Sequence, residues 1–236
     1  MASTNVSVAT KKQIQPTPEA TRSLQRAGGV ASLVEALTYL VGFTAMAAYL
    51  APEGFTVAQD DPSASLAFLL EHQAAMYVWY LVLYLVAGTA LVVLALGIHE
   101  RLKLSSPALA PTATAFGLIW SGLVLAGGMV ALVGQRAAVD LAAGDRADAV
   151  SAWIAVSVVQ DALGGGIELV GAAWVLLVSI AALRTAVLPR GLAVLGFVIG
   201  AAGLMTLVPQ LEDAAAIFGL GFIAWYVWAG RALIRG

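Results

Sequence analysis

An otherwise apolar stretch of the chain, residues 152–183, contains two carboxylates and three consecutive glycines. Asp161 and Glu168 are seven residues apart, so a continuous helix would place both on one face. Carboxylates inside a membrane are costly unless they pair or face a polar cavity, and they often mark ion pathways and proton relays. This stretch therefore predicts a site that binds or conducts a small cation, a proton or a polar solute.

A carboxylate and a histidine precede the apolar run of an earlier segment. Counting about 20 residues back from Ile98, the length that crosses the hydrocarbon, puts the outer edge of that segment near Val78. Glu71 and His72 then lie on the outer side of the membrane, within reach of Asp161. We expect these residues to line a pocket that opens outward. The alternative is that Glu71 and His72 form an ordinary solvated helix start.

One further acid lies inside the first apolar segment. Glu35 is about two turns from Arg26, which places it near the inner boundary of the membrane. Because an unpaired carboxyl is unfavourable in hydrocarbon, Glu35 is expected to face the other helices. On this estimate, about 15 Å of hydrocarbon separates Glu35 from Glu168. The predicted pocket or ion pathway comprises Glu35, Glu71, His72, Asp161 and Glu168.

The three glycines predict a hinge. Residues 152–183 would form a helix about 48 Å long, which exceeds the hydrocarbon core of about 30 Å. Either this helix projects outward from the membrane, or it breaks at the glycines. A break would direct the free N–H groups of the lower helix at the outer site. The alternative is that the glycines serve only close helix packing. We place the hinge at Gly164, Gly165 and Gly166.

The composition around these residues is typical of an integral membrane protein. Of 236 residues, 61% are hydrophobic and 11% are charged, whereas soluble domains carry about 25% charged residues. Only helices and closed barrels satisfy the backbone in lipid, and the apolar segments have the length of helices. The predicted fold class is an all-α polytopic membrane protein with six transmembrane helices. The segments lie near residues 29–50, 74–98, 113–134, within 152–183, 191–208 and 214–233; residues 1–27 form a flexible cytoplasmic tail and residues 28–236 the transmembrane domain.

The basic residues predict the orientation. Ten of the twelve lysines and arginines lie in the N-terminal tail, in residues 99–112, in residues 184–190 and near the C-terminus. Basic loops stay on the cytoplasmic side, so both termini are expected inside. Arginine outnumbers lysine, and the apolar residues are mostly alanine, valine, leucine and glycine. This composition suggests a bacterium and its cytoplasmic (inner) membrane. Trp153, Trp225 and Trp228 lie near segment ends and are expected to anchor at the membrane interface.

Several chemistries lack the residues that they require. There is no cysteine, and the two histidines, His72 and His99, lie at opposite ends of one segment, so neither thiolate chemistry nor bis-histidine haem is expected. No lysine lies within a span, and H-E-x-x-H, G-x-S-x-G and Walker A motifs are absent from the sequence. Glu71, His72 and Asp161 lack a characteristic metal-ligand spacing. We therefore expect no cofactor, no metal and, at a net charge of −2, no nucleic acid.

Runs in the last third of the chain resemble a known membrane protein family. The similarity is carried by L-P-R-G-L-A-V-L-G at residues 188–196, L-V-P at 207–209 and G-L-G-F-I-A-W-Y-V-W at 219–228, and it extends to G-G-V at 28–30. These residues resemble a family of bacterial six-helix integral membrane proteins classed as a domain of unknown function. The resemblance implies a six-helix membrane fold, but it implies no activity and no residue roles.

Two functions from different classes follow from these patterns. The first is a membrane protein whose outward-facing acidic pocket binds or transports a small cation, a proton or a polar solute. The second is an accessory or scaffold subunit of a larger complex, or a homo-oligomer, whose carboxylates pair with basic residues of a partner. The missing catalytic motifs and the small-residue face of Gly196, Gly200 and Gly203 favour the second. A membrane enzyme acting on a lipid or quinone is a third reading, and the sequence does not favour an enzyme.

Overall fold

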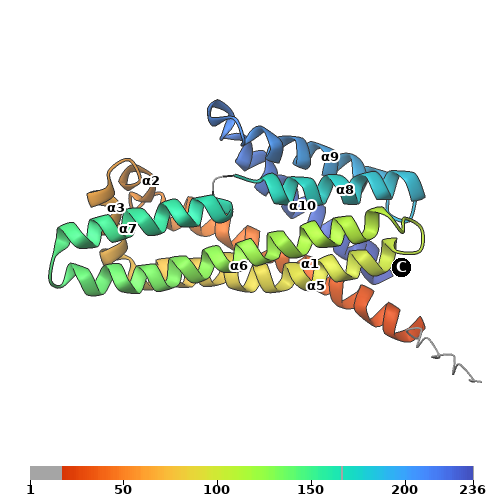
Figure 1. Cartoon of the computed structure of the whole chain (residues 1–236), viewed down its shortest axis with the longest axis horizontal. Helices are drawn as coiled ribbons and strands as arrows, with labels where there is room; N and C mark the ends of the chain where they lie inside the picture. The colour runs from red at the N-terminus through yellow and green to blue at the C-terminus, as the bar shows by residue number, and fades with distance from the viewer. Residues whose placement is uncertain (1–17, 166, 236) are drawn as a thin grey trace, which may run out of the picture.

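The computed structural model describes residues 18–165 and 167–235. Within these ranges the chain folds into helices joined by short connections (Figure 1). Residues 1–17 of the predicted tail lie outside the described residues, and its last ten residues already belong to the first helix. The α-helices are α1 (Pro18–Ala45), α2 (Phe55–Ala58), α3 (Pro62–Glu71), α4 (Gln73–Tyr80), α5 (Ala87–Leu102), α6 (Leu109–Ala142), α7 (Arg146–Gln160), α8 (Leu169–Thr185), α9 (Arg190–Met205) and α10 (Ala214–Arg235). Three π-helical segments, η1 (Met46–Leu50), η2 (Leu81–Val86) and η3 (Asp161–Gly165), and a 3₁₀ turn, η4 (Pro209–Leu211), complete the described chain.

The helices are long and apolar enough for a polytopic membrane protein. Five stretches in the described chain can cross a membrane by length and composition: Thr21–Leu50, Gln73–Leu102, Leu109–Ala142, Arg146–Thr185 and Ala214–Arg235. The sixth predicted span corresponds to α9, which is apolar but has 16 residues, or about 24 Å of helix. The described part of the chain is therefore all-α, with helices apolar and long enough to lie in a lipid bilayer.

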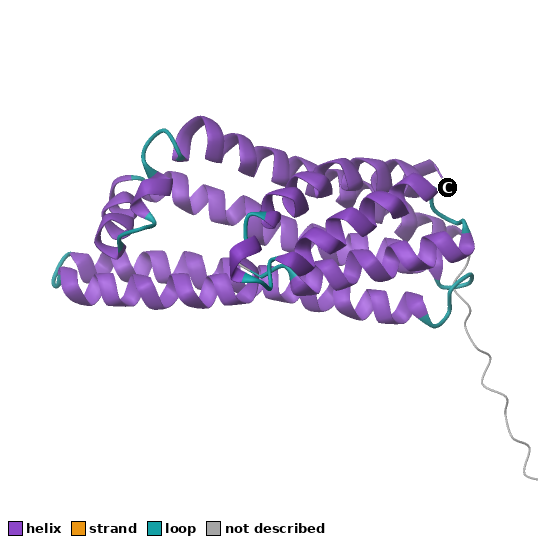
Figure 2. Ribbon diagram, turned by 90° about the horizontal axis from the view of Figure 1, so that it is seen from above, coloured by secondary structure: helices purple, strands orange, loops and turns teal. Residues whose placement is uncertain are grey.

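The helices form two hydrophobic cores along the long axis of the molecule (Figures 1 and 2). The larger core joins α1, α5, the first half of α6, and α8 to α10, and it contains fully buried Trp174, Phe222 and Trp225. The smaller core joins α2, α3, α4, α7 and the second half of α6, around Leu66 and Met76. Helix α6, at 34 residues and about 51 Å, runs through both.

Small residues set the distances between helices. The predicted face of Gly196, Gly200 and Gly203 on α9 is confirmed as buried, and added Cβ atoms there would meet side chains of α8 and α10 within 3 Å. On the other side of the bundle, a Cβ on Gly97 would lie 2.7 Å from the Cα atom of Gly28. Helices α1 and α5 therefore touch backbone to backbone at that point.

Two of the three tryptophans expected at the interface are core residues instead. Trp225 is fully buried, with its ring 5.4 Å from that of Trp174. Trp153 is 5% exposed and donates its indole N–H to the hydroxyl of Ser65 at 3.0 Å. Only Trp228 keeps substantial exposure, at 42%. Position near a segment end did not distinguish anchoring from packing, because Trp225 and Trp153 are buried against neighbouring helices whereas Trp228 is not buried.

The long fourth segment is interrupted at the glycines, and its first half extends away from the larger core. Helix α7 ends at Gln160, η3 follows, and α8 begins only at Leu169 (Figure 1). Gly164 has φ of 133°, a conformation that side chains rarely adopt. Gly165 ends η3, and Gly166 lies outside the described residues. The interruption separates Asp161 from Glu168, so the two acids do not share the face of one continuous helix.

Candidate functional site

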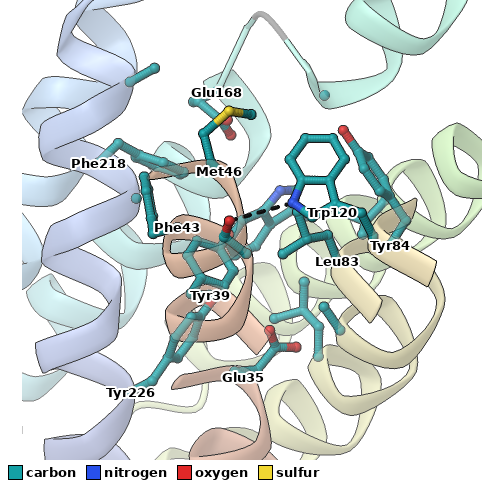
Figure 3. A pocket seen from close by; sticks show the side chains of 18 residues that line it. Glu35, Tyr39, Phe43, Met46, Leu83, Tyr84, Trp120, Glu168, Phe218 and Tyr226 are labelled. Carbon is teal, nitrogen blue, oxygen red and sulfur yellow. Dashed lines mark hydrogen bonds between the residues drawn. The ribbon is translucent and has the colours of Figure 1, made fainter. Parts of the chain in front are cut away.

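A cavity of about 280 Å³ lies inside the larger bundle, next to the interruption between η3 and α8 (Figure 3). Its walls come from α1, the α4–η2–α5 helix, α6, α10 and the connection into α8. Two carboxylic side chains line it, Glu35 from α1 and Glu168 from the start of α8. Segments at opposite ends of the sequence thus build one polar site.

Glu35 is held inside the bundle by the packing of α1. Its neighbours one turn earlier and later are fixed: the Ser32 hydroxyl donates to the carbonyl of Tyr226 at 2.7 Å, and Thr38 donates to the carbonyl of Glu35 at 2.9 Å. The Glu35 side chain is 1% exposed, and its Oε1 has no hydrogen-bond partner among the described residues. A buried, unpartnered carboxyl oxygen costs free energy, about 1–3 kcal/mol for a neutral group and more for a charged one.

Glu168 lies immediately before the first residue of α8. Its backbone N–H donates to Oγ1 of Thr206 at 3.0 Å, and that hydroxyl donates to the carbonyl of Gly203 at 2.7 Å. These bonds attach the start of α8 to the end of α9. The free N–H groups at the start of a helix favour a negative charge, so the position suits a carboxylate.

The middle of the cavity is aromatic (Figure 3). Tyr39 packs edge-on against Tyr226, with ring centroids 5.6 Å apart. The Trp79 indole N–H donates to the carbonyl of Gly42 at 3.4 Å, which joins α4 to α1. The Tyr84 hydroxyl accepts a 2.6 Å hydrogen bond from Nε2 of Gln160, at the end of α7. Glu35 and Glu168 lie at opposite ends of the site, with Tyr39 and Phe43 between them.

The sequence estimate placed hydrocarbon between Glu35 and Glu168, and the structure places a shared cavity there. That estimate assumed that Arg26 and Arg184 mark the cytoplasmic ends of their segments and are at the same depth in the membrane. Two residues after Arg26, α1 packs against Gly97 near the end of α5. On α8, Trp174 packs against Gly117 of α6. Arg184 lies ten residues beyond Trp174, level with the loop before α6. Arg26 therefore lies deeper in the bundle than Arg184, and Glu35 is correspondingly closer to Glu168.

The remaining three predicted pocket residues do not line this cavity. Glu71 is exposed at the end of α3. His72 lies between α3 and α4, where its Nδ1 is 3.3 Å from the Tyr49 hydroxyl and its ring is 4.3 Å from that of Phe68. Asp161 is exposed at the start of η3. The sequence estimate assumed continuous helices, and the structure breaks the chain after Glu71 and at Gly164. These two breaks are the physical reason why Glu71, His72 and Asp161 do not lie where a continuous helix would place them.

The aromatic lining was not anticipated from the sequence. Tyr77, Tyr80 and Tyr84 stand out as one broad face, yet only Tyr84 reaches the cavity. Trp120 and Tyr226 lie in runs of apolar residues where nothing distinguishes a cavity wall from solid core. Only an indirect indication of this lining was present in the sequence: a buried carboxyl such as that of Glu35 requires polar or aromatic neighbours on the helices that pack against α1.

The electrostatic character of the site favours positive charge. No lysine, arginine or histidine lines the cavity in the part of the chain that the structure describes. Across residues 18–165 and 167–235, no group of three or more histidine and acidic side chains could hold a metal ion. The site can therefore bind a cation or protons, or a polar solute with a positive end. No family model, curated protein or solved structure matches this chain.

Proposed function

We propose that the protein binds a small cation or protons in this cavity and moves them across the bacterial cytoplasmic membrane. The observation that carries the proposal is the carboxyl of Glu35, 1% exposed and without a partner for Oε1 among the described residues. A buried charge without compensation is strongly unfavourable. A bound cation, or a bound proton, would supply that compensation, and Glu168 offers a second carboxyl in the same cavity.

The proposed membrane orientation has six spans and cytoplasmic termini. Charges separate along the long axis of the molecule: the helix ends near the C-terminus are basic, and the opposite end around the α6–α7 turn is acidic. Since basic residues stay on the cytoplasmic side, the end of the molecule that holds the smaller core would face outward. Residues at the basic end are Arg101, Lys103, Arg184, Arg190, Arg231 and Arg235; those at the acidic end include Asp61, Asp140, Asp145 and Asp148. Membership of the six-helix family that the sequence resembles is part of this proposal.

Two acids outside the cavity would assist entry. Glu71 and Asp161 are both exposed, and in the proposed orientation they would lie on the outer side of the membrane. Exposed negative charges raise the local concentration of cations by electrostatic attraction. Gly164, which lines the cavity itself, would be the hinge next to Glu168. In this scheme Glu71 and Asp161 attract the cation, and Glu35 and Glu168 bind it.

The second candidate is an accessory subunit whose acids pair with a partner. The exposure of Glu71 and Asp161 favours it, because both are accessible to basic residues of another chain. Glu35 fits this candidate less well, since its side chain is buried within the bundle. Copurification in mild detergent tests it: a stable complex lost on combined charge reversal at Glu71 and Asp161 would support a subunit role.

Flux measurements in liposomes test the leading proposal. Purified protein is reconstituted, and uptake of Na⁺, K⁺, methylammonium and protons is compared with protein-free liposomes. We expect wild type to carry at least one of them, Glu168→Gln to fall to background, and Glu53→Gln to retain the flux. Glu53 is the matched control because it is an exposed carboxylate that neither lines the cavity nor has a role in the proposed entry path. Background flux of all four species through wild type would overturn the transport proposal.

A further inference from the structure

The cavity carries information about the class of cation. We infer that its preferred ligand is an organic ammonium ion with an apolar body, rather than a metal ion. This inference rests on the proposed function, because it assigns the ligand of the same cavity.

The walls are enriched in aromatic rings. Seven of the 18 lining residues are phenylalanine, tyrosine or tryptophan, whereas these residues make up 8% of the chain. The face of an aromatic ring attracts a cation within about 6 Å of its centre, and the attraction is strongest for cations that hold water weakly. Organic ammonium ions are of this kind. Metal ions such as Na⁺ and Mg²⁺ hold their water tightly and prefer oxygen ligands.

The oxygen atoms in the cavity are too dispersed for a metal ion. Glu35 and Glu168 stand at opposite ends, with Tyr39 and Phe43 between them (Figure 3). Hard metal ions require about six oxygen ligands at roughly 2.0–2.6 Å, all around one point. An ammonium group requires only one carboxylate nearby, provided that the rest of the ion contacts apolar surface. The arrangement therefore fits a cation whose charge lies at one acid and whose body lies along the rings.

The size of the cavity agrees with such a ligand. Its volume of about 280 Å³ is close to the lower end of small-molecule sites, about 300–1,000 Å³. One water molecule takes up about 30 Å³ in the liquid, so a single metal ion would leave most of the space to water. An ion with an aromatic or aliphatic body would instead bring apolar surface against Phe43, Leu83 and Phe218.

Ligand binding to the detergent-solubilised full chain tests the inference. Binding of benzyltrimethylammonium, Na⁺ and neutral benzyl alcohol is followed by the fluorescence of Trp79 and Trp120, which line the cavity, and by calorimetry. We expect benzyltrimethylammonium to bind at least tenfold more tightly than Na⁺ or benzyl alcohol. Glu35→Gln should abolish that preference over benzyl alcohol. Phe43→Leu should weaken binding about 2- to 30-fold, the range of a cation–π contact, and Phe43→Tyr should not.

The outcomes separate this inference from the proposed function. Na⁺ binding that is lost in Glu35→Gln, with no binding of benzyltrimethylammonium, would overturn the inference and leave the proposed function standing. Equal binding of benzyltrimethylammonium and benzyl alcohol, unchanged in Glu35→Gln, would also overturn it, because the cavity would then recognise only apolar surface. No binding of either cation would overturn this inference, whereas the proposed function is overturned only by background flux of all four species in liposomes. Correct folding of each variant is checked by its elution from a size-exclusion column.

Discussion

The proposed function depends most on one residue, Glu35. It is almost fully buried, its Oε1 lacks a partner among the described residues, and its neighbours on α1 are fixed by hydrogen bonds of Ser32 and Thr38. Nothing in these contacts explains an acid at this position as a packing residue. A binding site that is partly destabilised when empty is the simplest physical account, because the ligand then supplies the missing interactions.

Replacing this acid with an apolar residue should therefore stabilise the protein. We predict that Glu35→Leu raises the free energy of unfolding by about 1–3 kcal/mol, the cost of a buried unpaired polar group. The same variant should lose cation binding. Thermal unfolding in detergent, without added ligand, measures the first effect.

The exposed Glu71 provides the control for this prediction. Glu71→Leu removes the same carboxyl from a site that water already solvates, so its stability should change little. If Glu35→Leu proved less stable than wild type while Glu71→Leu did not, the Glu35 carboxyl would have a structural partner, and the account of an unfilled site would be wrong.

At the scale of elements, α1 is placed against α5 by a contact between two glycines. A Cβ on Gly97 would stand 2.7 Å from the Cα atom of Gly28 and 3.3 Å from its backbone nitrogen. Backbone atoms cannot rotate away, so the helices themselves would have to separate. Since α1 carries Glu35, Tyr39 and Phe43, this contact also sets the width of the cavity.

Gly97→Ala is predicted to lower stability by about 1–3 kcal/mol, as overpacking usually does. Gly122→Ala in α6 is the matched control, because a Cβ there meets nothing within 4 Å. Thermal unfolding of the two variants in one detergent compares them directly. Equal unfolding temperatures for Gly97→Ala and Gly122→Ala would show that α1 and α5 do not touch as described.

The connection between η3 and α8 tests a different property of glycine. Gly164 has φ of 133° and open space around its Cα atom, so alanine there would be strained but not crowded. Gly164→Ala should cost about 1–3 kcal/mol, the range for a residue in a sparsely populated conformation. Gly144→Ala is the control here, because Gly144 also lies outside the helices, has no positive φ and has room for a methyl group, with its nearest contact at 3.8 Å. No difference between these two unfolding free energies would argue against a break at Gly164.

At the scale of the whole molecule, the proposal places the basic end inside and the end with the second core outside. The chain has no cysteine, so single cysteines can report on each side without background. We chose Ser105, between α5 and α6, and Ser63, at the start of α3, because both are exposed.

In intact cells, a membrane-impermeant maleimide should label Ser63→Cys and not Ser105→Cys. Both should be labelled once the membrane is disrupted, which controls for reactivity. The reverse pattern would show that the termini face outward, and labelling of both in intact cells would contradict a single membrane crossing between Ser63 and Ser105.

Apolar segments were readable from the sequence because membrane helices must be long and hydrophobic whatever they contact. The shorter helices α2 and α3, and the separate packing of α7, were not predictable, since the apolar run of residues 152–183 continues on both sides of the glycines. The glycine face of α9 was readable because close contact demands small residues at a helical spacing. Its partners on α8 and α10 were not.

The candidate site was predictable only in part, and for a similar reason. Glu35 and Glu168 stood out because acids are rare in apolar helices. Their shared cavity did not, because it depends on how far α1 is shifted along its axis relative to α8. Trp120 and Tyr226 gave no sign of a cavity, since a ring in solid core and a ring at a cavity wall look alike in sequence.

The central claim is that Glu35 and Glu168 face one cavity that a cation can fill. Dicyclohexylcarbodiimide, an apolar reagent that couples to carboxyl groups, measures this directly when the modified peptides are quantified by mass spectrometry. The account predicts that both residues are modified, that saturating benzyltrimethylammonium or Na⁺ protects both together, and that modification of Glu71 is unaffected. Modification of Glu35 and Glu168 that no cation alters, or protection of one without the other, would contradict a shared cation site.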